Sequence, residues 1–179
     1  MIMADVLKIL LIILGILTVY VSYWLLAEAL FPRLVENACR QYRRPIRLTF
    51  LGLAAAILPV ILGIALAKTS HPLLKLIGIT FVVVPGLLGL AGSAGLTLRI
   101  GLGLPSPTDE TQPWRRVLRG GIVLAFCFLL PVVGWIIMPL WVLVSGLGAF
   151  ILAAREERTE RAKPAPGAPP ELVPANQPG

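Results

Sequence analysis

The hydrophobic positions of this chain fall in long uninterrupted runs, and most charged positions fall in short segments between them. At about 1.5 Å of rise per residue, a helix of about 20 apolar residues crosses the hydrocarbon core of a bilayer. The pattern therefore predicts an all-α protein, an integral membrane helical bundle with about five transmembrane helices. The predicted spans are 7–31, 47–67, 73–100, 114–130 and 135–154.

The first apolar run has two interpretations. The tripeptide Ala-Glu-Ala at 27–29 resembles the cleavage site of a signal peptide. However, the apolar stretch 7–31 is longer than a signal core, and its leading segment carries one lysine that is offset by Asp5. Cleavage would also leave the arginine-rich segment that follows outside the membrane. We therefore favour a retained membrane anchor.

The last apolar stretch, 120–154, is 35 residues long and carries no charge. A single helix of that length would extend over about 50 Å, which is much more than a bilayer needs. Proline ends a helix, glycine permits a turn and tryptophan favours the interface, so we expect a hairpin turn between two spans. A re-entrant loop is the alternative, because it returns the chain to the same side. The turn residues are Pro131, Gly134 and Trp135.

Two segments outside the spans have patterns of their own. Between Pro32 and Pro45, the apolar positions of residues 32–44 fall on one face of a helix, which predicts a short amphipathic helix on the membrane surface. A linker with chance periodicity is the alternative. Residues 159–179 contain six prolines, so we expect a disordered cytoplasmic tail after a membrane domain at 1–158.

The arginines orient the chain. They fall in three clusters, within 33–47, 99–119 and 155–161. Short loops rich in Lys and Arg stay on the cytoplasmic side of a membrane. Five spans then place the N-terminus outside and the C-terminus inside, in a bacterial plasma (inner) membrane. The basic residues expected to face anionic lipid are Arg33, Arg40, Arg43, Arg44, Arg115 and Arg116.

Composition supports a membrane location. The chain is 57% hydrophobic and 14% charged, whereas a soluble domain is typically about half apolar and about a quarter charged. A net charge of +7 could indicate nucleic acid, but the basic residues flank apolar spans and do not form a stripe on a polar domain. We expect no nucleic-acid partner. The expected partners are membrane lipids, a second copy of the chain or another membrane protein.

Candidates for chemistry are few. Glu28 is the only candidate for a functional ionisable group inside a predicted span; it lies about one turn from the cytoplasmic end of that span, where it could pair with a nearby arginine. His71, the only histidine, lies in a turn without further ligand residues, so neither a metal nor a haem site is expected. A Ser-His-Asp set cannot be assembled, and no phosphate-binding glycine loop occurs. The sequence predicts no catalytic residue and no cofactor, and therefore a protein that is not an enzyme.

Small residues recur in three of the predicted spans at spacings close to one helical turn. Residues of this size let helix backbones approach closely, either within one bundle or in a seam with a partner. The residues expected to pack helices are Gly52, Ala56, Gly89, Ala91, Ser93, Gly95, Ser145 and Gly148.

Five segments occur in an order that carries a resemblance to a known family. They are LFPRLV at 30–35, residues 45–52, the glycine-rich end of the third span, LLPVVGW at 129–135 and GLGA at 146–149. From residue 30 to 154 the chain resembles the multi-span membrane module of bacterial polymer-forming, bactofilin-like proteins. This chain lacks the β-rich repeat region of that family, so polymer formation is not implied. The module also brings no catalytic residues.

Two functions of different class follow. A non-catalytic scaffold or accessory subunit of a membrane complex is favoured, because no charged residue lies deep in the predicted spans. A small transporter or channel for an apolar or uncharged solute is the alternative, since prolines inside spans can supply broken helices. Span hydroxyls that converge on one water-filled space would favour transport, whereas hydroxyls bonded to neighbouring backbone would favour the scaffold. They are Thr18, Tyr20, Ser22, Thr80, Ser93, Thr97 and Ser145.

Overall fold

The computed structural model describes residues 2–104, 106–107, 112, 114–130 and 133–162. These residues are almost entirely helical and contain no strand. The helices, in chain order, are α1 (Ile2–Leu30), α2 (Pro32–Gln41), α3 (Pro45–Ala67), α4 (Pro72–Leu102), α5 (Trp114–Phe128), the π-helical turn η1 (Val133–Ile137) and α6 (Met138–Ala162).

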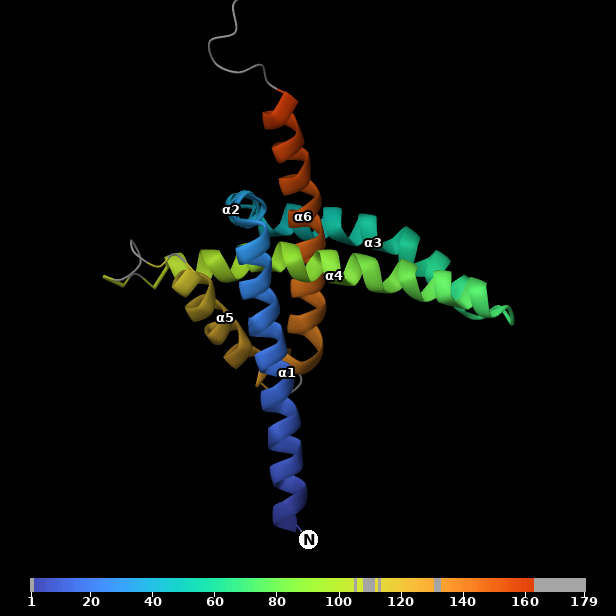
Figure 1. Cartoon of the computed structure of the whole chain (residues 1–179), viewed down its shortest axis with the longest axis horizontal. Coiled ribbons are helices and arrows are strands. Elements are labelled where there is room, and N and C mark those ends of the chain that lie inside the picture. The colour runs from blue at the N-terminus through green and yellow to red at the C-terminus, as the bar shows by residue number, and fades with distance from the viewer. Residues whose placement is uncertain (1, 105, 108–111, 113, 131–132, 163–179) are drawn as a thin grey trace, which may run out of the picture.

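Two pairs of helices cross near the middle of the molecule (Figure 1). α1 and α6 run along one direction, and the hairpin of α3 and α4 runs across them. α2 packs at the crossing against α4 and α6, and α5 runs from the end of α4 toward the middle of α1. The segments that project from the crossing include the N-terminal half of α1 and the outer half of the α3–α4 hairpin, which are called the two arms below.

Prolines set where three of the helices begin. Pro32, Pro45 and Pro72 each occupy the first turn of a helix, where the missing N–H would have no intrahelical acceptor. Pro59 and Pro85 lie inside α3 and α4, and both helices continue through them. The prolines that the sequence offered as breaks in these two spans therefore leave each span as one helix.

Four helical segments of the described chain are long and apolar enough to cross a membrane. They are Met3–Leu30, Pro45–Ala67, Pro72–Leu102 and Val133–Thr159, and they fit an integral membrane protein. The bounds of α3 and α4 agree with the predicted spans to within two residues. α5 has 15 residues, fewer than the roughly 20 that a span needs.

Helix backbones touch at the crossing because glycines leave no side chain there. A Cβ added to Gly92 of α4 would overlap the carbonyl oxygen of Gly146 of α6, and one added to Gly52 of α3 would overlap that of Val144. Gly120 of α5 meets the carbonyl of Thr97 in the same way. Such approach maximises van der Waals contact, on which helix association in lipid depends.

Large side chains fill the space beside these contacts. Trp24, Val117 and Val142 are buried in the cluster that joins α1, α5 and α6. The indole Nε1 of Trp24 donates a hydrogen bond of 2.8 Å to Ser93 Oγ, so the one polar atom of this ring is satisfied. Tyr20 and Phe128 pack around it, with ring centroids 5.6 Å apart in an edge-to-face arrangement.

The crossing predicts opposite effects for one substitution at two glycines of α4. Ala is a better helix former than Gly by about 1 kcal/mol, and a Cβ on Gly86 meets nothing within 4 Å. Gly86→Ala should therefore leave the melting temperature in detergent unchanged or slightly raised. Gly92→Ala should lower the stability by about 1–3 kcal/mol, because its Cβ meets backbone that cannot move aside. Equal melting temperatures of the two variants would contradict the packing.

Candidate functional site

Four of the span hydroxyl groups that the sequence singled out are bonded to the backbone of their own helices. Thr97 Oγ1 donates to the carbonyl of Ala94 at 2.8 Å, and Ser93 Oγ donates to that of Leu90 at 2.7 Å. Thr18 and Thr80 bond in the same way to carbonyls four residues earlier in their own helices. These groups are satisfied by nearby backbone, which is the arrangement expected of a scaffold.

Most of the helix-packing residues predicted from the sequence are buried between helices, and two are only half-buried. Gly89 of α4 is buried against α6, and an added Cβ there would lie 2.5 Å from the Leu143 carbonyl oxygen. Gly95 of α4 is buried against α2, and an added Cβ there would lie 2.7 Å from the Ala38 Cβ. Gly52 and Gly148 meet each other's helices at the α3–α6 contact. Ser93 and Ser145 are buried within hydrogen-bonding distance of aromatic residues, whereas Ala56 and Ala91 are only half-buried.

The amphipathic helix α2 is docked onto protein. Val35 and Ala38 are fully buried, and Cys39 is buried with them against α4. At the end of α2, the Tyr42 hydroxyl lies 3.4 Å from Ser145 Oγ of α6, and burial raises the pKa of Tyr42 to about 12. The sequence predicted an interfacial helix here. The amphipathic face exists, but α4 and α6 cover it, since glycine and alanine on those helices leave room for it.

The predicted lipid-facing arginines divide into two groups. Arg40, Arg43 and Arg44 line a pocket of about 230 Å³, together with Arg47 of α3. Arg115 and Arg116 lie in the first turn of α5, where the guanidinium of Arg115 stacks over Trp114 at 5.6 Å. Arg33 is exposed near the start of α2. Arg40 also pairs with Glu36 at 3.0 Å, an exposed pair of the kind that contributes little stability.

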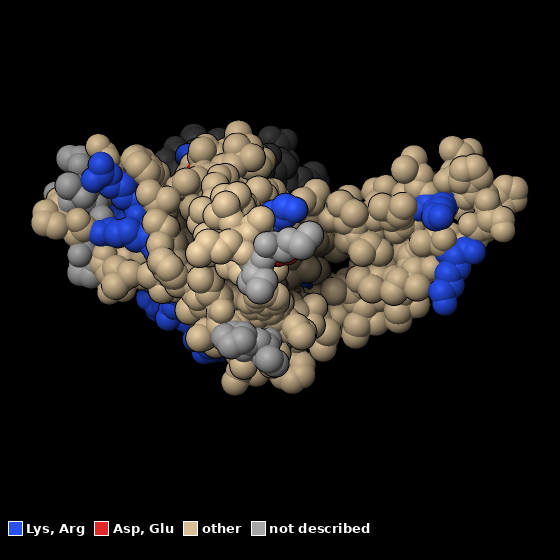
Figure 2. Space-filling model, turned by 90° about the horizontal axis from the view of Figure 1, so that it is seen from below, with Lys and Arg blue, Asp and Glu red and all other residues tan. Residues whose placement is uncertain are grey.

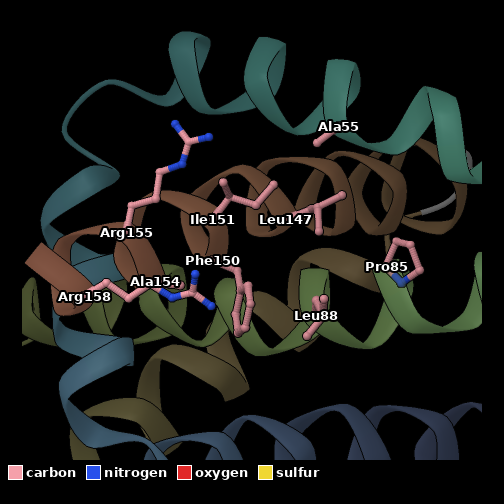
Figure 3. A pocket seen from close by; sticks show the side chains of 9 residues that line it. All are labelled: Ala55, Pro85, Leu88, Leu147, Phe150, Ile151, Ala154, Arg155 and Arg158. Atoms are coloured by element: carbon pink, nitrogen blue, oxygen red, sulfur yellow. The ribbon is translucent and has the colours of Figure 1, made fainter.

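A second pocket, of about 280 Å³, lies between α3, α4 and α6 (Figure 3). Ala55 and Pro85 lie toward one end, and Arg155 and Arg158 of α6 lie at the other. Both arginines are exposed. Sequence reasoning placed them in a basic cluster without assigning them a site. The two arginines are three residues apart and come directly after an apolar run, which makes them neighbours on a helix surface. This spacing is the sequence feature that could have indicated the site.

The predicted hairpin turn lies beside the middle of α1. Gly134 and Trp135 border an apolar pocket of about 270 Å³ whose opposite wall includes Ile13, Leu17 and Tyr20. Gly134 is buried, and a Cβ there would overlap the Cys127 carbonyl. Trp135 is exposed. Pro131, the third predicted turn residue, lies outside the described residues, as do residues 163–179 of the predicted tail; α6 continues to Ala162.

The few candidates for chemistry stand apart from one another. Glu28 is half-buried near the end of α1, and its Oε2 has no hydrogen-bond partner in the structure. His71 is exposed at the start of α4. Within the described residues, no three His, Cys, Asp or Glu side chains gather where they could hold a metal ion.

No known protein family matches the chain, and no curated protein or solved structure is significantly similar to it. The resemblance to the membrane module of bactofilin-like proteins therefore stays a hypothesis that these comparisons do not test.

The docking of α2 predicts an unreactive thiol at Cys39. Burial raises the pKa of this thiol, and the thiolate is the form that reacts with maleimides. In a Cys127→Ser background, labelling of Cys39 in detergent at neutral pH should be slow, should accelerate as the pH rises, and should become fast on unfolding. Arg40→Cys in a chain that also carries Cys39→Ser provides the exposed control on the same helix. Equal labelling rates for the two cysteines would show that α2 is not docked.

Proposed function

We propose that this protein is a non-catalytic multi-pass membrane protein that acts as a scaffold or accessory subunit of a membrane complex. The observation that carries the proposal is the use of its span hydroxyls. Five of the seven, all except Tyr20 and Ser22, are bonded to their own helix backbones or to buried aromatic partners. The pocket beside the α5–α6 turn, which Tyr20 borders, has mainly apolar walls. A transporter of polar solutes needs polar groups that face the solute.

The two projecting arms support a role in binding other helices. On α1 and on the outer α3–α4 hairpin, apolar side chains are exposed around the helices, as at Leu11 and Leu58. Gly15 and Gly86 have nothing within 4 Å of an added Cβ, so a further helix can approach the backbone there. In a bilayer these surfaces contact either lipid or the spans of a partner, which is another membrane protein or a second copy of this chain.

The proposal includes an orientation in the plasma membrane, with the N-terminus outside and the C-terminus inside. Its support is the distribution of basic residues. The arginines cluster around α2, the α4–α5 end and the end of α6, whereas Lys68 and Lys75 lie at the tip of the hairpin. Figure 2 shows basic side chains at both ends of the face seen from below, with a further basic side chain near its middle. Loops rich in arginine favour the cytoplasmic side.

Within this orientation, we propose that α5 and α6 are the two helices of a re-entrant hairpin and do not complete two separate crossings. α5 is short, and the turn contacts α1 near its middle instead of reaching its N-terminal end. Re-entrant backbone is tolerated where protein covers it. Gly134 is buried, and its N–H donates to the Leu130 carbonyl at 2.9 Å. The rival function, a small transporter or channel for an apolar or uncharged solute, would use the 270 Å³ pocket beside this turn.

Cysteine accessibility in intact and permeabilised cells tests the orientation and the hairpin. Single cysteines at Ser70, Val133 and Thr159 would be placed in a Cys39→Ser, Cys127→Ser background. We expect Ser70→Cys to be labelled from outside, Thr159→Cys only after permeabilisation, and Val133→Cys in neither case. Labelling of Val133→Cys from outside would establish five spans, and labelling of Thr159→Cys in intact cells would reverse the orientation.

Photo-crosslinking in native membranes tests the scaffold role. A photoreactive residue at Leu11 or Leu58 should give a protein adduct of one reproducible mass, and Gly86→Leu should weaken the adduct from the hairpin arm. The same residue at Val142, which is 1% exposed, is the buried control and should give no intermolecular adduct. If both arms yield only lipid adducts and proteoliposomes release an uncharged solute, the transporter replaces the scaffold.

A further inference from the structure

The pocket between α3, α4 and α6 exists because two close helix contacts meet at a corner. α3 touches α6 at Gly52 and Gly148, and α4 touches α6 at Gly92 and Gly146. Away from these points the helices separate, and the small side chain of Ala55, three residues after Gly52, leaves the space open. The result is a cavity of about 280 Å³, near the lower limit of the cavities that hold small ligands.

The walls of this pocket select hydrocarbon. Its apolar residues come from all three helices: Ala55 from α3, Pro85 and Leu88 from α4, and Leu147, Phe150, Ile151 and Ala154 from α6. In Figure 3 these side chains line the space between the three ribbons. A cavity of this size and lining holds part of an acyl chain and offers no polar partner to a sugar or a peptide.

The mouth of the pocket selects an anion. Arg155 and Arg158 lie three residues apart on α6; in Figure 3 the side chain of Arg155 extends toward α3 and that of Arg158 toward Phe150. Within the described part of the chain, neither arginine has an ion pair. Glu156, between them in sequence, accepts a hydrogen bond from Gln41 Nε2 at 3.1 Å. Guanidinium groups bind phosphate through paired N–H donors. The neighbouring pocket of Arg40, Arg43, Arg44 and Arg47 adds positive charge at the same end of α6, because Leu152 forms part of its wall.

Hydrocarbon walls and a cationic mouth together match one kind of molecule. We propose that the α3–α4–α6 pocket binds an anionic glycerophospholipid of the inner leaflet, with part of one acyl chain among Ala55, Leu88 and Phe150 and the phosphate at Arg155 and Arg158. This inference rests on the membrane setting and orientation of the proposed function, but not on its scaffold role. Basic pockets between helices on the cytoplasmic side are suited to anionic head groups.

Native mass spectrometry of the full chain tests the site. The protein would be purified in detergent containing equal amounts of phosphatidylglycerol and phosphatidylcholine, and the lipids retained on the folded protein would be counted. The wild type should retain one phosphatidylglycerol in preference to phosphatidylcholine. The double substitution Arg155→Gln, Arg158→Gln should lower this retention about tenfold, since it removes two charge-assisted contacts.

Two matched controls separate the pocket from general attraction to a basic protein. Lys68→Gln, Lys75→Gln removes the same charge at the exposed tip of the α3–α4 hairpin and should leave retention unchanged. Ala55→Leu fills the pocket and should abolish retention with every arginine present, whereas Ala54→Leu, at the exposed neighbouring position, should not. Slow labelling of Cys39 verifies the fold of each variant.

Three results would overturn the site. Equal loss in the arginine pair and in the lysine pair would mean attraction to the whole basic surface. Equal retention of the two phospholipids would mean that the head group is not recognised, and preferential retention of a free fatty acid would assign a different occupant. None of these results affects crosslinking from the arms. Conversely, arms that crosslink only to lipid would refute the scaffold role and leave this site standing.

Discussion

Backbone-to-backbone contact at glycine is the interaction on which the rest of this structure depends. In a bilayer, apolar helices gain little by leaving lipid for one another, so association depends on close van der Waals contact and hydrogen bonds. Gly92 and Gly146 bring α4 and α6 together, and Gly52 and Gly148 bring α3 and α6 together. The crossing then creates both the buried surface that receives α2 and the corner that becomes the α3–α4–α6 pocket.

Local features of the sequence predicted the helices well because helix ends are set locally. Pro45 and Pro72 begin α3 and α4 close to where the predicted spans begin, since proline fits the first turn of a helix. The amphipathic face of α2 was equally visible. What covers that face was not, because amphipathicity describes one helix, and the Gly95 backbone that receives Ala38 lies far away in the sequence.

The depth of the α5–α6 turn is a property of packing, and charge patterning cannot provide it. A hairpin that crosses the membrane and one that turns back within it return the arginines to the same side. The proposal of a re-entrant hairpin rests on the part of α1 that the turn contacts, which includes Leu17 and Tyr20. Whether prolines inside the spans break a helix was ambiguous for a related reason. Pro59 and Pro85 lie within continuous helices. In a membrane helix, neighbouring groups can compensate for the hydrogen bond that a proline removes.

The candidate lipid site was out of reach of the sequence for a geometric reason. Arg155 and Arg158 are close to Phe150 along the chain, but Pro85 and Ala55 join them only where α4 and α3 each cross α6. The hydroxyl groups described above are bonded within or between helices, whereas these two arginines lie exposed at the rim of an apolar cavity. The two proposals therefore divide outward recognition by position, with apolar shape along the arms and anion binding at the arginine-rich end. If the arms bind a partner as proposed, shape must select that partner, because charged residues lie near the ends of the arms.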